Sequence, residues 1–143
     1  MCFRSLLLLP MCLAGLPAEA QHGGDLQAQI LYAFQSEDDN ELSSLIQTLS
    51  TQVQAGGADN ALRYDLAHAD YRLGLMSAAG PAGNAESAFA DCVEQLKPVL
   101  EKDGRSAEAL ALQSACYANL ARFRKLEAVL LRSRAAEIGR AHV

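Results

Sequence analysis

His68 is the residue of this sequence best suited to acid–base chemistry, because the carboxylate of Asp70 follows it two positions later. A histidine beside a carboxylate could act as a general base with its orienting acid. Residues two apart on a helix point in different directions, however, and the closer neighbours of His68 are Asp65 and Arg72, three and four positions away. We therefore interpret His68 as a polar residue on the rim of a helix.

Other catalytic and metal-binding motifs are absent from the sequence. It has no His-x3-His, no Cys-x2-Cys, no glycine-rich phosphate loop and no Gly-x-Ser-x-Gly elbow. Early cleavage would leave Ala20-Gln21-His22 at the amino terminus, an arrangement that binds copper, but the cleavage site described next argues against it. We predict a protein that is not an enzyme and that uses no cofactor or metal.

Residues 1–20, MCFRSLLLLPMCLAGLPAEA, have the organisation of a secretory signal peptide. Arg4 precedes an apolar run, Leu6–Leu16, and Ala18-Glu19-Ala20 is a small-x-small cleavage site. The run is shorter than the about 20 residues that span a bilayer. We predict export to the periplasm or the exterior, and a mature chain from Gln21 with no stable membrane anchor. The composition is typical of a Gram-negative bacterium.

Residues 21–137 have the length of one domain. The chain has a formal net charge of −5 and no run of Lys and Arg. Because phosphate binding needs clustered basic side chains, we do not expect nucleic acid as a partner.

Two cysteines, Cys92 and Cys116, lie in the mature chain on apolar faces of predicted helices. In an oxidising compartment such a pair can be bridged. Buried free thiols are the alternative, because unpaired cysteine is among the most often buried residue types. The sequence leaves both open.

The mature chain is predicted to be all-helical. Ala and Leu dominate, strand formers are few, and apolar residues recur at spacings of three and four. Asp38 with Glu41 forms a capping-box pattern, and Gly56 is placed as a left-handed C-cap. The segments expected as helices are about 25–35, 39–55, 59–75, 85–102, 106–121 and 125–136.

A degenerate internal repeat runs through these helices. The stretch YDLAHADYRLG from Tyr64 aligns with LALQSACYANL from Leu110, which places Tyr71 over Tyr117. Because the matches fall on helical face positions, we interpret the segment Asn60–Ala136 as two copies of one helix pair.

These copies resemble the tetratricopeptide repeat family, whose pattern is an aromatic residue, a Leu-Gly pair and a Tyr on the first helix, then Ala-x3-Phe on the second. The matching positions are Tyr64, Ala67-His68, Tyr71 and Ala85-x3-Phe89, then Leu110, Gln113-Ser114, Tyr117 and Leu126-x3-Leu130. The family's glycine is replaced by His68 and Ser114, and the loop after Leu75 is longer.

The resemblance implies antiparallel helix hairpins stacked as a short α-solenoid, with a concave surface that binds a protein or peptide. An irregular helical bundle is the alternative. By correspondence with groove-facing positions of the family, Asp65, Arg72 and Asn119 are candidate groove residues, and ordinary solvated side chains are the alternative for them. We therefore expect an exported interaction or scaffold module.

The last residues, Ile138–Val143, match one reading frame of a common sequencing-library adapter. We predict that this segment is not native protein and that the helical domain is incomplete at its C-terminus. The alternative function is then the N-terminal helical region of a larger exported protein, which could be an enzyme with its active residues outside this chain.

Overall fold

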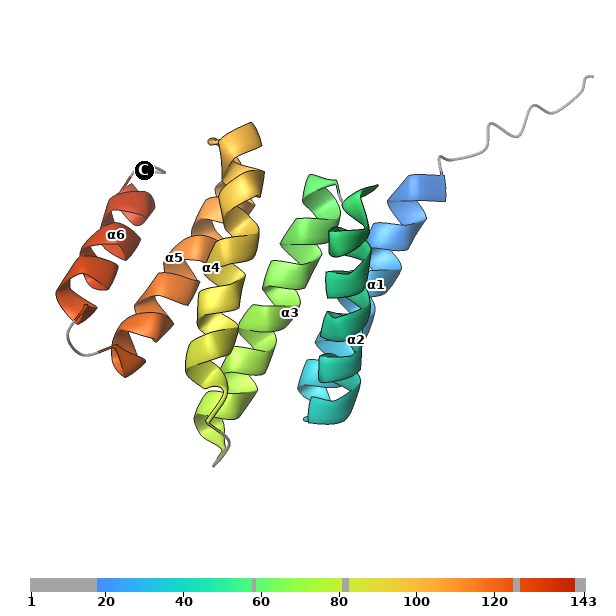
Figure 1. The fold of residues 1–143 in the computed structure, drawn as a ribbon, viewed down its shortest axis with the longest axis horizontal. Coiled ribbons are helices and arrows are strands. Elements are labelled where there is room, and N and C mark those ends of the chain that lie inside the picture. Colours follow the sequence, from blue (N-terminus) through green and yellow to red (C-terminus); the bar gives the residue numbers. More distant parts are fainter. Residues whose placement is uncertain (1–17, 58, 81–82, 125–126, 141–143) are drawn as a thin grey trace, which may run out of the picture.

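The computed structural model describes residues 18–57, 59–80, 83–124 and 127–140. The apolar run of the predicted signal peptide lies outside these residues. Figure 1 shows helices throughout the described part of the chain, as the sequence predicts. They are α1 (Ala18–Gln35), α2 (Asp39–Gln52), the π-turn η1 (Val53–Gly57), α3 (Asn60–Ala79), α4 (Ala85–Lys102), α5 (Ala107–Phe123) and α6 (Ala128–Arg140).

The helices are arranged in sequence order as a row, with α1 and α6 at opposite ends (Figure 1). Each helix packs against the next, and α3 also contacts both α1 and α5. Helix α3 is therefore the central element. Its residues Leu66 and Ala69 join a core with α1 and α2, and its Ala67 joins a second core with α4, α5 and α6.

Helix α2 begins and ends where local sequence signals place it. The Asp38 carboxylate accepts a hydrogen bond from the Glu41 backbone N–H (2.9 Å), which confirms the predicted N-cap. The reciprocal half of a capping box is not formed, because the Asp38 N–H donates to the Ala33 carbonyl. Gly56 has φ of +83°, the left-handed conformation predicted for the C-cap.

Three helices have bounds that differ from the prediction. Helix α1 begins at Ala18 rather than near residue 25, and α3 continues to Ala79 rather than ending near residue 75. Helix α6 begins later and continues to Arg140, through part of the predicted adapter-derived segment. Ala78 near the end of α3 and Ile138 near the end of α6 pack against the second core, which accounts for the longer ends of these two helices.

Helices α3 and α4 approach closely at Gly74. A Cβ atom placed there would lie 2.7 Å from Phe89 Cε1. The Phe89 ring is fully buried and lies between Tyr71 of α3 and Phe123 of α5, with ring centroids 6.0 and 6.1 Å away. The residue that permits the close approach is therefore Gly74, six positions after the repeat position held by His68.

Candidate functional site

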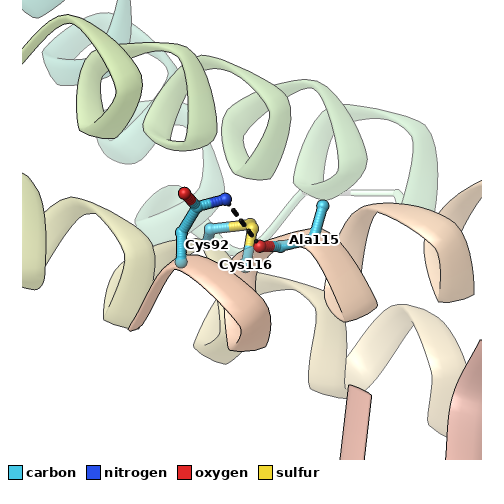
Figure 2. Close-up of a disulfide and its surroundings, with 4 residues drawn as sticks. Cys92, Ala115 and Cys116 are labelled. Carbon is cyan, nitrogen blue, oxygen red and sulfur yellow. Dashed lines mark hydrogen bonds between the residues drawn. A yellow bond between two sulfur atoms is a disulfide. The ribbon is translucent and has the colours of Figure 1, made fainter. Parts of the chain in front are cut away.

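A disulfide joins α4 to α5 in the second core. Cys92 and Cys116 are both fully buried, with Cα atoms 6.4 Å apart, and Figure 2 shows the bond between them. Both residues lie within apolar surroundings that include Phe89, Leu96 and Leu120. Of the two alternatives that the sequence leaves open, the structure contains the bridge.

Asn119, one of the three candidate groove residues, makes a hydrogen bond within its own helix. Its Nδ2 donates to the Ala115 carbonyl at 2.9 Å. The side chain is partly buried. Its amide oxygen remains available as an acceptor, so Asn119 could still contact a partner.

Asp65 lies between α1 and α3 rather than on an open surface. It is only 4% exposed, and its carboxylate accepts a hydrogen bond from Gln27 Nε2 at 2.9 Å. Burial raises the pKa of Asp65 and the nearby charge of Asp59 raises it further, whereas the bond from Gln27 lowers it. A partner would therefore reach this carboxylate only at its edge.

Arg72 contacts the same neighbouring helix. Its guanidinium carbon lies 4.6 Å from the centroid of the Phe34 ring on α1, within cation–π range. The Arg72 Nε atom is buried and has no hydrogen-bond partner in the part of the chain that the structure describes. The structure thus places Asp65 and Arg72 together at the α1–α3 contact, whereas Asn119 lies on α5.

His68 lies one turn before Arg72 on α3. Its ring stacks on Tyr64, with ring centroids 6.3 Å apart and ring planes 7° from parallel. Its buried Nδ1 atom has no hydrogen-bond partner among the residues that the structure describes. Burial lowers the pKa of His68, and the positive charge of Arg72 lowers it further. A neutral imidazole in this place could accept one hydrogen bond from a bound partner or donate one to it.

Asp70, the residue that could have oriented His68, is directed elsewhere. It is 5% exposed, and burial together with the negative charge of Asp91 on α4 raises its pKa to about 8. Within the described ranges, no hydrogen bond or ion pair reaches this carboxylate. The structure therefore does not assemble His68 and Asp70 into an acid–base pair, in agreement with the interpretation from helix geometry.

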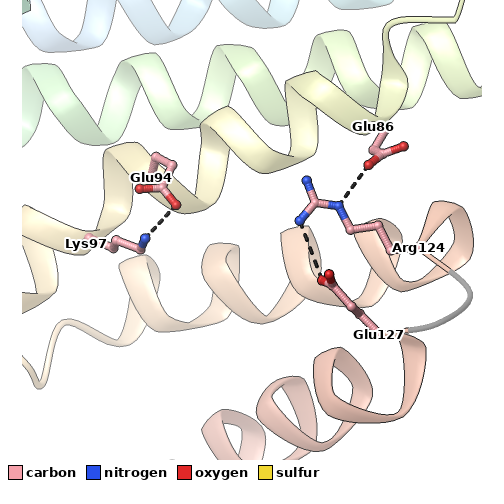
Figure 3. Close-up of polar contacts among 5 residues, drawn as sticks. All are labelled: Glu86, Glu94, Lys97, Arg124 and Glu127. Carbon is pink, nitrogen blue, oxygen red and sulfur yellow. Dashed lines mark hydrogen bonds and ion pairs between the residues drawn. The ribbon is translucent and has the colours of Figure 1, made fainter.

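Ion pairs lie on the outer surface of α4 and at the turn into α6 (Figure 3). Lys97 pairs with Glu94 one turn away on α4. Arg124 pairs with Glu86 at 2.8 Å and with Glu127 at 3.7 Å, and so connects the start of α4 with the chain that enters α6. All five side chains are at least one-third exposed, so these pairs add little stability.

The described residues contain neither a metal-binding cluster nor a helix that could span a membrane. In that part of the chain, no group of three or more His, Cys, Asp and Glu side chains is placed to hold a metal ion. No described helix is sufficiently long and apolar to cross a membrane.

Sequence reasoning missed two features of this region. The hydrogen bond between Gln27 and Asp65 joins residues far apart in the chain, and no local pattern signals it. The sequence does contain a signal for the burial of Asp70, because this residue lies three positions after Ala67 and four before Gly74, on the face of α3 toward α4.

Searches for similar proteins found no matching family model, curated protein or solved structure.

Proposed function

We propose that this chain is an exported, non-catalytic module that binds a protein or peptide on the surface formed by α1, α3 and α5. The observation that carries the proposal is the set of contacts between alternate helices, α1 with α3 and α3 with α5. In stacks of helix hairpins, contacts of this kind bring the first helices together into one continuous surface. This also supports the tetratricopeptide-like solenoid over an irregular bundle.

The polar groups at the centre of this surface fit peptide recognition. His68 Nδ1 and Arg72 Nε have no hydrogen-bond partner among the described residues, and a buried polar atom without a hydrogen bond is costly. Because Arg72 is partly exposed, a peptide carbonyl or carboxylate could bond to its guanidinium. Asp65 takes the role of a positioning residue, because its carboxylate accepts a hydrogen bond from Gln27 of α1 and so connects α1 with α3.

The Cys92–Cys116 disulfide supports export. Disulfides persist in the periplasm and outside the cell and are rare in the cytosol. The proposed setting is therefore the periplasm or the exterior, as the predicted signal peptide also implies.

A pull-down from the exported protein fraction of the source cells tests the proposal. The wild-type chain should retain a discrete partner, and the Asp65→Ala/Arg72→Ala variant should lose it. The matched control is Glu94→Ala/Lys97→Ala, which removes an exposed ion pair from the outer surface of α4 (Figure 3) and should retain the partner. Circular dichroism checks that each variant is folded. Equal retention by all three proteins would refute this binding surface.

A further inference from the structure

The large apolar side chains that the described surface exposes lie at the two ends of the helix row. At one end are Leu31 and Tyr32 of α1, which are 40% and 72% exposed. At the other are Phe123 of α5 and Val129 and Leu130 of α6, which are 39%, 78% and 66% exposed. Single exposed apolar residues are ordinary, but apolar groups gathered at each end of a stack mark docking surfaces.

The charges of the two ends have opposite sign. Residues 25–59, which include the end of α1 and all of α2, contain six carboxylates and no Lys or Arg. The acidic side chains are Asp25, Glu37, Asp38, Asp39, Glu41 and Asp59. Helix α6 instead carries Arg132, Arg134 and Arg140 against the single carboxylate of Glu137. The chain has no run of basic residues, yet the row of helices separates its charges.

A shallow hollow lies at each end. Between α5 and α6 a groove of about 660 Å³ is lined by residues that include Arg105, Leu110, Tyr117 and Arg134. Arg134 lies over the Tyr117 ring, 5.9 Å from its centroid. This groove and the exposed Val129 and Leu130 of α6 are called here the tail surface.

The opposite hollow, of about 390 Å³, lies between α1 and the start of α2. Its lining includes Ala28, Tyr32, Asp38 and Glu41. With the exposed Leu31 it is called here the head surface. Each surface thus combines apolar groups with charges, acidic at the head and basic at the tail.

We propose that the tail surface of one copy of this chain binds the head surface of a second copy. The two surfaces are complementary in charge and lie at opposite ends of a row in which each helix already packs against the next (Figure 1). Head-to-head or tail-to-tail pairing would bring like charges together, which is unfavourable. A head-to-tail contact leaves one free surface at each end, so it extends into a chain of copies or closes into a ring.

Two charge-changing variants test the contact. The tail variant is Arg105→Glu/Arg134→Glu and the head variant is Tyr32→Arg/Glu41→Arg; all four side chains are exposed, so the fold should be retained. The matched controls are Lys97→Glu/Lys102→Glu and Glu94→Arg/Glu101→Arg, which change charge on the exposed side of α4. None of the substituted residues lies in Ile138–Val143, although Ile138 of that segment lines the tail groove.

Sedimentation velocity of the purified full chain, from micromolar to millimolar concentration, gives the readout. The wild type and both controls should show a mass that rises with concentration and falls as salt is increased, because salt screens exposed charges. The tail variant and the head variant should each associate at least about tenfold more weakly. An equimolar mixture of the two should associate again, because the intact head of the tail variant meets the intact tail of the head variant.

Three results would overturn the proposal. The first is a wild type that stays monomeric throughout. The second is association that survives in both charge-changing variants, which would place the contact elsewhere, residues 1–17 included. The third is a mixture of tail and head variants that remains monomeric, which would show that intact head and tail surfaces do not bind each other.

Discussion

Loss of the disulfide between α4 and α5 should lower the free energy of unfolding by about 3.5 kcal/mol. Cys92 and Cys116 are separated by 24 residues, and closing a loop of this length restricts the unfolded chain by about that amount. Urea denaturation followed by circular dichroism measures the change in wild-type protein with and without reductant. With a slope of about 1–3 kcal/mol per molar urea, the midpoint should fall by roughly 1 to 3.5 M on reduction.

The Cys92→Ala/Cys116→Ala variant separates the crosslink from the packing of the sulfur atoms. Because both cysteines are fully buried, the variant should be somewhat less stable than the reduced wild type, since it also loses buried side-chain atoms. Free-thiol counting on the denatured, unreduced wild type should find no reactive thiol from this pair. Equal midpoints with and without reductant, or two reactive thiols from this pair, would refute the reasoning.

Three further substitutions test the packing and electrostatics of the helices. Burial raises the pKa of Asp70 to about 8, so the folded chain keeps a proton that the unfolded chain loses near the ordinary pKa of 3.8. The free energy of unfolding of the wild type should therefore fall as pH rises from about 4 to about 8, by at most about 1.4 kcal/mol per pH unit. In urea denaturation, Asp70→Asn should remove most of this fall. A variant with the same pH profile as the wild type would contradict the raised pKa of Asp70. Gly74→Ala should lower the free energy of unfolding by about 1–3 kcal/mol, because its Cβ would overlap the buried Phe89 ring. The control Gly104→Ala, whose Cβ would have its nearest contact at 3.5 Å, should not meet such a clash. Equal melting temperatures for the two variants would argue against the close approach of α3 and α4. Asp38→Ala should lower the free energy of unfolding, measured by urea denaturation, by about 1 kcal/mol, because α2 loses its N-cap. A variant as stable as the wild type would count against that cap.

Local signals in the sequence predict the starts of several helices correctly. The Asp38 side chain accepts the predicted capping hydrogen bond from the Glu41 backbone N–H. Asp59 and Ser106, at the predicted starts of α3 and α5, accept capping hydrogen bonds from Leu62 and Ala109. Such caps depend on residues within one turn of each other, so a sequence displays them directly. The ends of α3 and α6 were predicted less well, because stacking on neighbouring helices extends them.

Which residues face each other across helices could not be predicted. The repeat pattern placed Asp65 in an open groove, yet its carboxylate bonds to Gln27 of α1. Likewise, Val129 and Leu130 belong to the apolar pattern of the last helix, but only Leu131 beside them is buried. Helix periodicity identifies an apolar face, whereas the rotation and crossing of neighbouring helices decide how much of that face is covered.

The most direct test of the proposed binding surface is site-specific photo-crosslinking in the source cells. A crosslinking residue at Ala61 would lie on α3 one turn before Asp65, and one at Ser87 would lie on the exposed side of α4 as the control. The proposed function predicts a discrete crosslinked partner from Ala61 that is absent from Ser87 and lost with Arg72→Ala. Equal crosslinking from both positions, or none from Ala61, would contradict it.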